Sequence, residues 1–310
     1  MQVAITGSSG FIGSALAARL AGAGADVLRV RRGDPADGGA HWSPQEGWFR
    51  PGALEGVDAV VHLTGVSVGA RRWTARRREV LRSSRVDATR TLVDHLRTLT
   101  RRPRVLVTAS AIGYYGCRGD ETLTEASSSG DGFLADLVRD WEAEAARASE
   151  LGIRMVYARF APILSMQGEL MQKLLPPFKM GVGGRLGSGR QRFSWVTLED
   201  AVEAVAFAVE RDSLSGPVNV SAPGALTNAE FTKALGRALH RPTLFPLPSP
   251  MLKLVFGSGR ANETLLASQH VVPEKLTAAG FAFADREIGA TLERLLQGRP
   301  VERGEGIAQP

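Results

Sequence analysis

The stretch Gly7-Ser8-Ser9-Gly10-Phe11-Ile12-Gly13 decides which fold this sequence is expected to adopt. It follows an aliphatic run at residues 3–6, typical of a buried strand, and it opens a helical pattern at residues 11–23. A strand, a glycine-rich turn and a helix in this order are the context in which such a turn holds the pyrophosphate of a dinucleotide. The spacing is GxxGxxG rather than GxGxxG, but the physical demands are the same.

Each glycine of this turn has its own task. Gly7 permits a tight turn out of the strand, Gly10 lets the backbone approach a pyrophosphate, and Gly13 lets the helix pack closely on the sheet. Free amides at the start of the helix then face the phosphate charge. Because 35 glycines make chance matches easy, the position in the first strand–turn–helix unit favours this interpretation over an ordinary turn.

The first half of the chain continues this alternation of strands and helices. Strands are predicted at residues 26–31, 59–63, 105–109 and 154–160, with a short one near 41–42, and helices at 75–99 and 133–150. Residues 33–54 are rich in glycine and proline and are expected to form a long irregular connection. The pattern predicts an α/β fold with a doubly wound parallel sheet of the Rossmann type.

The pattern changes after Phe160. A glycine-rich segment at residues 181–189 is followed by predicted helices at 198–211, 228–239 and 288–296 and a strand at 217–220. We therefore expect a dinucleotide-binding domain over residues 1–165 and a smaller substrate-side lobe over 166–298, interleaved with the end of the sheet. The polar tail, residues 299–310, is expected to be disordered.

The composition is that of an ordinary globular enzyme. Hydrophobic residues make up 44% and charged residues 23% of the 310 positions. No apolar run approaches the ~20 residues that span a bilayer, so no membrane partner is expected. The chain opens directly on a strand and Cys117 is its one cysteine, which favours a cytoplasmic location without disulfides. Nothing in the sequence indicates the oligomeric state.

Arginine gives the chain a net charge of +6. The densest patch contains Arg71, Arg72, Arg76, Arg77, Arg78, Arg82 and Arg85. Aromatic residues do not alternate with these arginines as on a base-stacking surface, so no nucleic-acid partner is expected. A solvated helix face is the favoured interpretation, and contact of a few arginines with an anionic cofactor is the alternative.

The end of the second strand indicates which dinucleotide is bound. An NAD site usually places Asp or Glu there to accept hydrogen bonds from the ribose 2′-hydroxyl. Here the strand ends on Arg31 and Arg32, whose guanidiniums match a 2′-phosphate. The sequence therefore favours NADP(H) over NAD(H), with two ordinary surface arginines as the alternative.

Many sequence blocks in order resemble the extended short-chain dehydrogenase/reductase superfamily. The closest resemblance is to its atypical "epimerase family" subgroup of the bacterial YfcH type, including a C-terminal region like the domain of unknown function DUF1731. The blocks are residues 7–13, 60–65, 72–74, 84–87, 109–116, 132–135, 140–142, 187–191, 194–195 and 227–231. The resemblance as a whole extends over nearly the whole chain, roughly residues 1–298.

The resemblance implies a set of cofactor contacts. These are Gly7, Gly10, Phe11, Ile12 and Gly13 in the turn, Arg31 and Arg32, Leu63 and Thr64 at a strand end, Arg85 and Ile163. Arg85 is thus the one member of the arginine patch expected to act functionally. The family often has Ala-Gly-Glu where this chain has Thr-Gly-Val from Thr64, so no role is assigned to a carboxylate there.

The usual proton chemistry of the superfamily is incomplete. Ser110, at a strand end, suits the serine that orients the substrate oxygen. The tyrosine and lysine of the YxxxK pair are expected near Phe133, where residues 133–137 contain neither. Tyr114 is a substitute candidate, although packing of Tyr114 and Tyr115 against the sheet is at least as well supported. Asp120, Glu121 and Glu125 are expected to solvate their loop, and Cys117 has no base nearby in sequence.

The second lobe supplies candidates for a substrate pocket. Residues 181–195 resemble the stretch by which nucleotide-sugar epimerases grip a pyrophosphate, but Phe193 replaces the gripping arginine. Arg190 and Arg192 remain candidates for an anionic substrate, and Trp195 either lines the pocket or belongs to the core. Capping of a helix explains Asp200, and the isolated His240 and His270 predict no metal site.

Two functions fit these observations. The first is an NADP(H)-dependent oxidoreductase or epimerase-like enzyme acting on an unknown small molecule. The second is a non-catalytic NADP(H)-binding redox sensor or interaction protein. The glycine turn at residues 7–13 fits both functions. The motifs on the side of the expected substrate pocket favour the enzyme, and the missing tyrosine and lysine favour the sensor.

Overall fold

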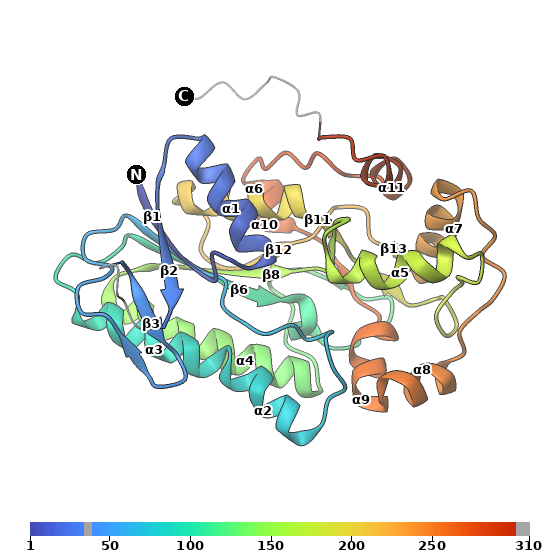
Figure 1. The fold of residues 1–310 in the computed structure, drawn as a ribbon, viewed down its shortest axis with the longest axis horizontal. Helices are drawn as coiled ribbons and strands as arrows, with labels where there is room; N and C mark the ends of the chain where they lie inside the picture. The colour runs from blue at the N-terminus through green and yellow to red at the C-terminus, as the bar shows by residue number, and fades with distance from the viewer. Residues whose placement is uncertain (34–38, 302–310) are drawn as a thin grey trace.

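An eight-stranded sheet forms the centre of the computed structural model, which describes residues 1–33 and 39–301 (Figure 1). Its strands, in spatial order, are β12 (Gly216–Val220), β8 (Arg154–Phe160), β6 (Val105–Ala111), β5 (Ala59–His62), β1 (Gln2–Thr6), β2 (Asp26–Arg32), β3 (His41–Ser43) and β4 (Trp48–Phe49). Neighbouring strands are parallel except in the β3–β4 hairpin. The predicted doubly wound parallel sheet is confirmed.

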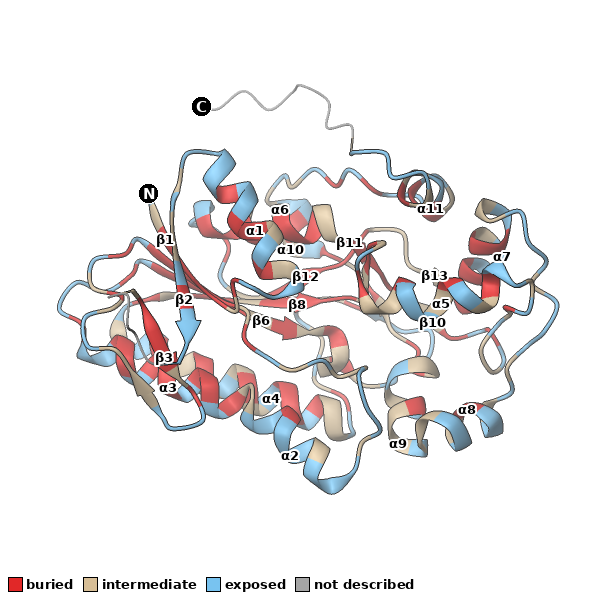
Figure 2. Ribbon diagram, in the orientation of Figure 1, coloured by how far each residue is buried: buried red, intermediate tan, exposed pale blue. Residues whose placement is uncertain are grey.

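Helices cover both faces of this sheet. On one face lie α1 (Phe11–Gly22), α6 (Leu198–Glu210) and α10 (Glu274–Ala278), and on the other lie α3 (Val86–Thr98) and α4 (Phe133–Ala146) (Figure 1). Successive residues of β1 divide between the two cores: Val3 and Ile5 pack under α1, and Ala4 packs on the α3 side. Burial on both faces explains why the strands are almost continuously apolar (Figure 2).

A second core lies beyond the sheet. It is built by α5 (Glu169–Lys179), α7 (Asn228–Ala238) and α11 (Ile288–Leu296). Two two-stranded ladders adjoin it: β9 (Ile163–Leu164) with β11 (Val196–Thr197), and β10 (Arg192–Phe193) with β13 (Leu226–Thr227). A third ladder, β7 (Thr122–Leu123) with β14 (His270–Val271), packs in the core on the α1 side of the large sheet. Between these segments the chain returns to the large sheet through α6 and β12.

The prediction of one helix over residues 75–99 is wrong, because two helices form there. The first, α2 (Ala75–Ser83), ends at Ser84 and Arg85, and α3 starts at Val86. The Leu81 carbonyl accepts hydrogen bonds from the side chains of Ser84 and Arg85, and the Arg85 amide bonds to Arg82 instead. Side chains thus satisfy the carbonyl that a continuous helix would use.

Other predicted bounds shift by a few residues. The helix expected at 133–150 is α4 followed by the 3-10 turn η2 (Arg147–Leu151), which Gly152 ends with φ 76°. Two more helices, α8 (Ser249–Phe256) and α9 (Ser258–Arg260), lie near α2 (Figure 1).

Among the described residues, no helix is long and apolar enough to cross a membrane. Most of the predicted disordered tail, residues 302–310, lies outside the described residues.

A buried chain of hydrogen bonds links the sheet to the helices beneath it. Thr64 Oγ1 donates to Thr6 Oγ1 (3.1 Å), and Thr6 Oγ1 lies 2.7 Å from His62 Nδ1. His62 Nε2 lies 3.1 Å from Thr89 Oγ1, which also accepts a hydrogen bond from Trp141 Nε1. Burial lowers the pKa of the His62 imidazole to about 3, so the ring is neutral at ordinary pH.

This shift in pKa predicts a pH-dependent stability. Between pH 6.5 and about 3 the unfolded state binds a proton at His62 and the folded state does not. The free energy of unfolding therefore falls as the pH is lowered through this window, by up to about 1.4 kcal/mol per pH unit from this group. Denaturant titrations from pH 7 to pH 4 (roughly the range around the ordinary histidine pKa) measure the slope.

The matched variants are His62→Gln and His240→Gln, since the His240 side chain is exposed. His62→Gln is expected to flatten the slope and also to lower stability at neutral pH, because the glutamine amide cannot satisfy both threonines. His240→Gln is expected to keep the wild-type slope. An unchanged slope in His62→Gln would contradict the assignment.

Candidate functional site

The glycine turn packs directly on the end of a neighbouring strand. Gly7 has φ +71°, and a Cβ there would lie 2.8 Å from the Leu63 carbonyl oxygen. A Cβ at Gly13 would lie 2.2 Å from the Gly7 carbonyl oxygen, so neither glycine tolerates a side chain without backbone movement. Gly10 is the N-cap of α1, whose first turn contains no acidic residue. Its free amides and positive dipole suit an anion.

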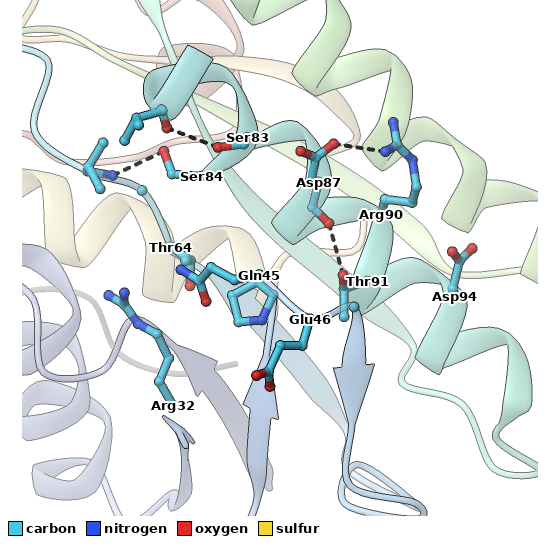
Figure 3. A pocket seen from close by; sticks show the side chains of 15 residues that line it. Arg32, Gln45, Glu46, Thr64, Ser83, Ser84, Asp87, Arg90, Thr91 and Asp94 are labelled. Carbon is cyan, nitrogen blue, oxygen red and sulfur yellow. Dashed lines mark hydrogen bonds and ion pairs between the residues drawn. The ribbon is translucent and has the colours of Figure 1, made fainter. Parts of the chain in front are cut away.

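A cavity of about 610 Å³ lies at the carboxyl edge of the sheet. It is enclosed by the end of β2, the β3–β4 turn, the segment after β5, and α2 and α3 (Figure 3). Its lining residues are Arg32, Pro44, Gln45, Glu46, Gly47, Thr64, Gly65, Val66, Val80, Ser83, Ser84, Asp87, Arg90, Thr91 and Asp94. This edge of a parallel sheet is where such folds bind ligands, and the volume suits a nucleoside.

The three arginines of β2 do different things. Arg32 lines the cavity, and Figure 3 shows its guanidinium beside Thr64 and Gln45. Arg31 is not a lining residue, because alternate residues of a strand point to opposite faces. Arg29, which sequence reasoning missed, donates from Nη1 to the Ser8 carbonyl oxygen (3.1 Å) and ties the strand to the glycine turn. Strand alternation is the signal that would have distinguished Arg32 from Arg29 and Arg31, which share the other face of β2.

Arg85 supports the loop beside the cavity. Its Nη2 donates to the Val66 carbonyl oxygen (3.0 Å) and its guanidinium lies 5.3 Å from the centroid of the Trp141 ring. No described carboxylate bonds to it. Burial, with a smaller contribution from the charge of Arg77, lowers the pKa of the Arg85 guanidinium to about 10. Arg85 therefore remains a cation behind the loop at Gly65 and Val66.

The other implied cofactor residues surround the turn. Phe11 is partly exposed at the start of α1, and its ring lies 3.1 Å from the position of a Cβ on Gly168. Ile12 and Ile163 pack against the sheet core on the α1 side. The Leu63 carbonyl lies against Gly7, and Thr64 lines the cavity.

Ser110 belongs to a buried charged network that the sequence did not predict. Its Oγ donates to Glu142 Oε1 (2.5 Å), and Arg159 bonds both Glu142 oxygens, at 2.8 and 2.7 Å. Burial by itself lowers the pKa of Arg159, but the hydrogen bonds and charge of Glu142 raise it above its ordinary value. Glu142 comes from α4 and Arg159 from β8. Only the motif at residues 140–142 hinted at a role for this carboxylate.

The network continues to two tyrosines of the 3-10 turn η1 (Ile112–Tyr115). Arg159 Nη1 donates to the Tyr115 hydroxyl (3.0 Å), which donates to Asn219 Oδ1 (2.7 Å). Burial raises the pKa of Tyr115, which keeps this hydroxyl protonated. The ring of Tyr114, the candidate, is half-buried with its centroid 3.5 Å from the Arg159 guanidinium carbon.

The position of the expected YxxxK pair is occupied by apolar packing. Phe133 and Leu134 lie in a cluster with Val66, and the Phe133 ring meets Trp73 at 5.3 Å between centroids. These side chains exchange no proton. The polar side chains near this end of β6 are instead those of Ser110, Glu142 and Arg159, which form a Ser–Glu–Arg arrangement. It can bind a hydroxyl and hold a proton between two oxygens.

The second-lobe candidates are not brought together. Arg190 is exposed, and Arg192 Nε bonds to Asp120 Oδ1 at 3.0 Å. Trp195 is 0% exposed and donates to the Gly224 carbonyl oxygen, which places it in the core and not in a pocket. Its core alternative is the one the structure adopts, because α5, α7 and α11 close around the indole.

Several secondary candidates have structural roles. Glu125 was expected to be solvated, but it is buried and accepts hydrogen bonds from the amides of Asn219 and Lys275. Asp200, besides its place in the first turn of α6, accepts the amides of Ala284 and Asp285. In residues 1–33 and 39–301 no three His, Cys, Asp or Glu side chains gather as a metal site.

Known proteins match almost the whole chain. Residues 3–221 match the NAD dependent epimerase/dehydratase family, and residues 247–295 match a domain of unknown function, DUF1731. Epimerase family protein Mb2239 of Mycobacterium bovis is 46% identical over 291 residues, covering 94% of this chain and 96% of the relative. Epimerase family protein YfhF of Bacillus subtilis is 33% identical over 305 residues, covering 96% and 99%.

Two solved structures share the fold at similar identity. Human epimerase family protein SDR39U1 (isoform 2), crystallised with NADPH, has a TM-score of 0.85 and 32% identity and covers 96% of this chain and 99% of its own. A nucleoside-diphosphate sugar epimerase from Corynebacterium glutamicum has a TM-score of 0.78 and 33% identity over 97% of this chain and 59% of its own. The resemblance drawn from the sequence is confirmed, and the chain belongs to the NAD-dependent epimerase/dehydratase family.

Proposed function

We propose that this protein binds NADP(H) and uses it as an oxidoreductase or epimerase-like enzyme on a small molecule. The observation that carries the proposal is Arg32, whose guanidinium enters the cavity beside the glycine turn. No described residue bonds or pairs with that guanidinium, so it is available to a 2′-phosphate. The human relative crystallised with NADPH supports the phosphorylated coenzyme.

The residues of the site suit the parts of this coenzyme. The amides at the start of α1, between Gly10 and Gly13, would hold the pyrophosphate. The cavity between the β3–β4 turn and α3 would hold the adenosine, with Thr64 and Gly65 along one wall. Arg32 would neutralise the 2′-phosphate. When bound, the coenzyme supplies hydride transfer.

The proton chemistry would depend on Ser110 and Glu142. In the usual enzymes a tyrosine and a lysine move the substrate proton, and here the expected position of that pair, residues 133–137, contains neither. The Ser110 hydroxyl would orient a substrate oxygen, and Glu142 would accept the serine proton when that hydroxyl takes one from the substrate. Arg159 positions the carboxylate through two hydrogen bonds.

A non-catalytic redox sensor is the second candidate. Ser110 is only 4% exposed and its hydroxyl is already bound to Glu142. If that network stays closed with coenzyme bound, the protein would report the NADPH to NADP⁺ ratio without turnover.

Charge reversal at Arg32 tests the coenzyme. Arg32→Glu is expected to weaken NADPH binding by roughly 10- to 100-fold and NADH binding far less, because it removes charge-assisted hydrogen bonds to a dianion. Titration calorimetry with both coenzymes measures this. Arg31→Glu is the matched control, and its smaller effect would follow from its place outside the cavity. Equal losses for NADPH and NADH in Arg32→Glu would refute the 2′-phosphate contact.

Removal of the Ser110 hydroxyl tests for enzyme activity. With a panel of carbonyl and sugar substrates, followed by the absorbance of reduced nicotinamide, Ser110→Ala is expected to lower turnover by about 100-fold or more. NADPH affinity should stay at the wild-type value, and Ser149→Ala, on the surface, should leave both unchanged. Tight NADPH binding by the wild type with no turnover on any substrate would favour the sensor.

A further inference from the structure

A second cavity, of about 1020 Å³, adjoins the first at Arg32, Gly65, Val66 and Val80. It opens between the end of β2 and the segment that leads into α2. Its lining residues are Arg32, Gly65, Val66, Ser67, Ala70, Arg71, Arg72, Thr74, Arg76, Arg77 and Val80. Five of these are arginines and none is Asp or Glu. Such a surface attracts a compact anion of more than one charge.

Little on the described chain neutralises these arginines. The guanidiniums of Arg71 and Arg76 make no hydrogen bond or ion pair with a described residue, and those of Arg72 and Arg77 reach only main-chain carbonyls, of Leu254 and Ser67. The Nε of Arg77 is buried without a partner within residues 1–33 and 39–301. Because this atom is shielded from solvent, the donors available to a ligand in the cavity are the exposed guanidiniums, including those of Arg71 and Arg76.

The start of α2 adds to the positive potential. Thr74 is its N-cap, and the first turn of this nine-residue helix contains no acidic residue. Thr74, Arg76 and Arg77 all line the cavity, so the helix N-terminus faces it together with two side chains. The helix dipole and the guanidiniums therefore act in the same direction.

The second lobe holds this wall in place. Arg72 Nη2 donates to the Leu254 carbonyl oxygen of α8 (3.1 Å), and Arg260 Nη1 lies 3.5 Å from the Arg71 carbonyl oxygen. Wall residues anchored in this way lose less freedom when a ligand binds. Sequence reasoning assigned Arg71, Arg76 and Arg77 to a solvated face; Arg71 and Arg76 are exposed, and all three line a cavity together with Arg32.

We propose that this cavity is a phosphate monoester site in which Arg32 and the arginines of α2 hold the anion from two sides. A phosphate dianion offers three oxygens to planar guanidiniums and to helix amides, which matches this set of donors. One source of the phosphate is the 2′-phosphate of the coenzyme, and this assignment rests on the function proposed above. The other source is the phosphate of a separate small ligand.

Single substitutions on α2 test the site. Arg76→Gln and Arg77→Gln are each expected to weaken binding of adenosine 2′,5′-bisphosphate about tenfold, measured by calorimetry on the full chain. Binding of adenosine 5′-monophosphate should not change. Arg82→Gln is the matched control on the same helix, since Arg82 pairs with Asp140 and does not line the cavity. Unliganded Arg76→Gln should melt no lower than wild type, because a like charge is removed and no contact with a described residue is lost, whereas Arg77→Gln also loses the hydrogen bond to the Ser67 carbonyl and should melt somewhat lower.

The ligands separate the two sources. Loss of bisphosphate affinity alone identifies the coenzyme phosphate. Unchanged bisphosphate affinity with inorganic phosphate binding that both variants lose identifies a separate phosphorylated ligand. If both variants bind the bisphosphate and inorganic phosphate as wild type does, the proposal is overturned. In that case a selective NADPH defect in Arg32→Glu would still leave the proposed function standing.

Discussion

The close approach of the glycine turn to the end of β5 is the constraint on which this site depends. Gly7 lies against the Leu63 carbonyl and Gly13 against the carbonyl of Gly7, so strand, turn and helix meet with no room for side chains. That contact brings the N-terminus of α1 to the same edge of the sheet as Thr64. It places a helix N-terminus without acidic residues next to a cavity, and both face the segment that follows β5.

The segment after β5 connects the functional parts of the molecule. Thr64 and Gly65 line the first cavity, Val66 and Ser67 line the second, and Arg85 and Arg77 hold the carbonyls of Val66 and Ser67. Two guanidiniums bind adjacent carbonyls of this loop, and the carboxylate of Glu169 also contacts it by accepting a hydrogen bond from Ser67 Oγ. The five arginines that line the second cavity suit a ligand with several negative charges.

The catalytic question turns on the buried pair of Glu142 and Arg159. A buried ion pair is costly to desolvate and contributes little net stability, although breaking it is strongly destabilising. Here the pair also binds Ser110 and, through Tyr115, Asn219 of β12. The network joins five segments, β6, α4, β8, η1 and β12, just below the carboxyl edge of the sheet. A side-chain network that holds a proton near a serine is compatible with proton transfer in an enzyme. It is equally compatible with a rigid scaffold that has no catalytic activity.

The sequence by itself determined the parallel sheet, the phosphate turn and the family, because aliphatic runs, glycine spacing and helical periodicity are local signals. It also indicated Arg31 and Arg32, but only their alternation along β2 in the folded sheet showed that Arg32 enters the cavity. The break before Val86 and the burial of Trp195 and Glu125 were decided by tertiary contacts. The Ser110–Glu142 bond and the meeting of Arg32 with the α2 arginines join segments distant in the chain. No local pattern encodes such contacts, since packing of the whole fold determines which side chains meet.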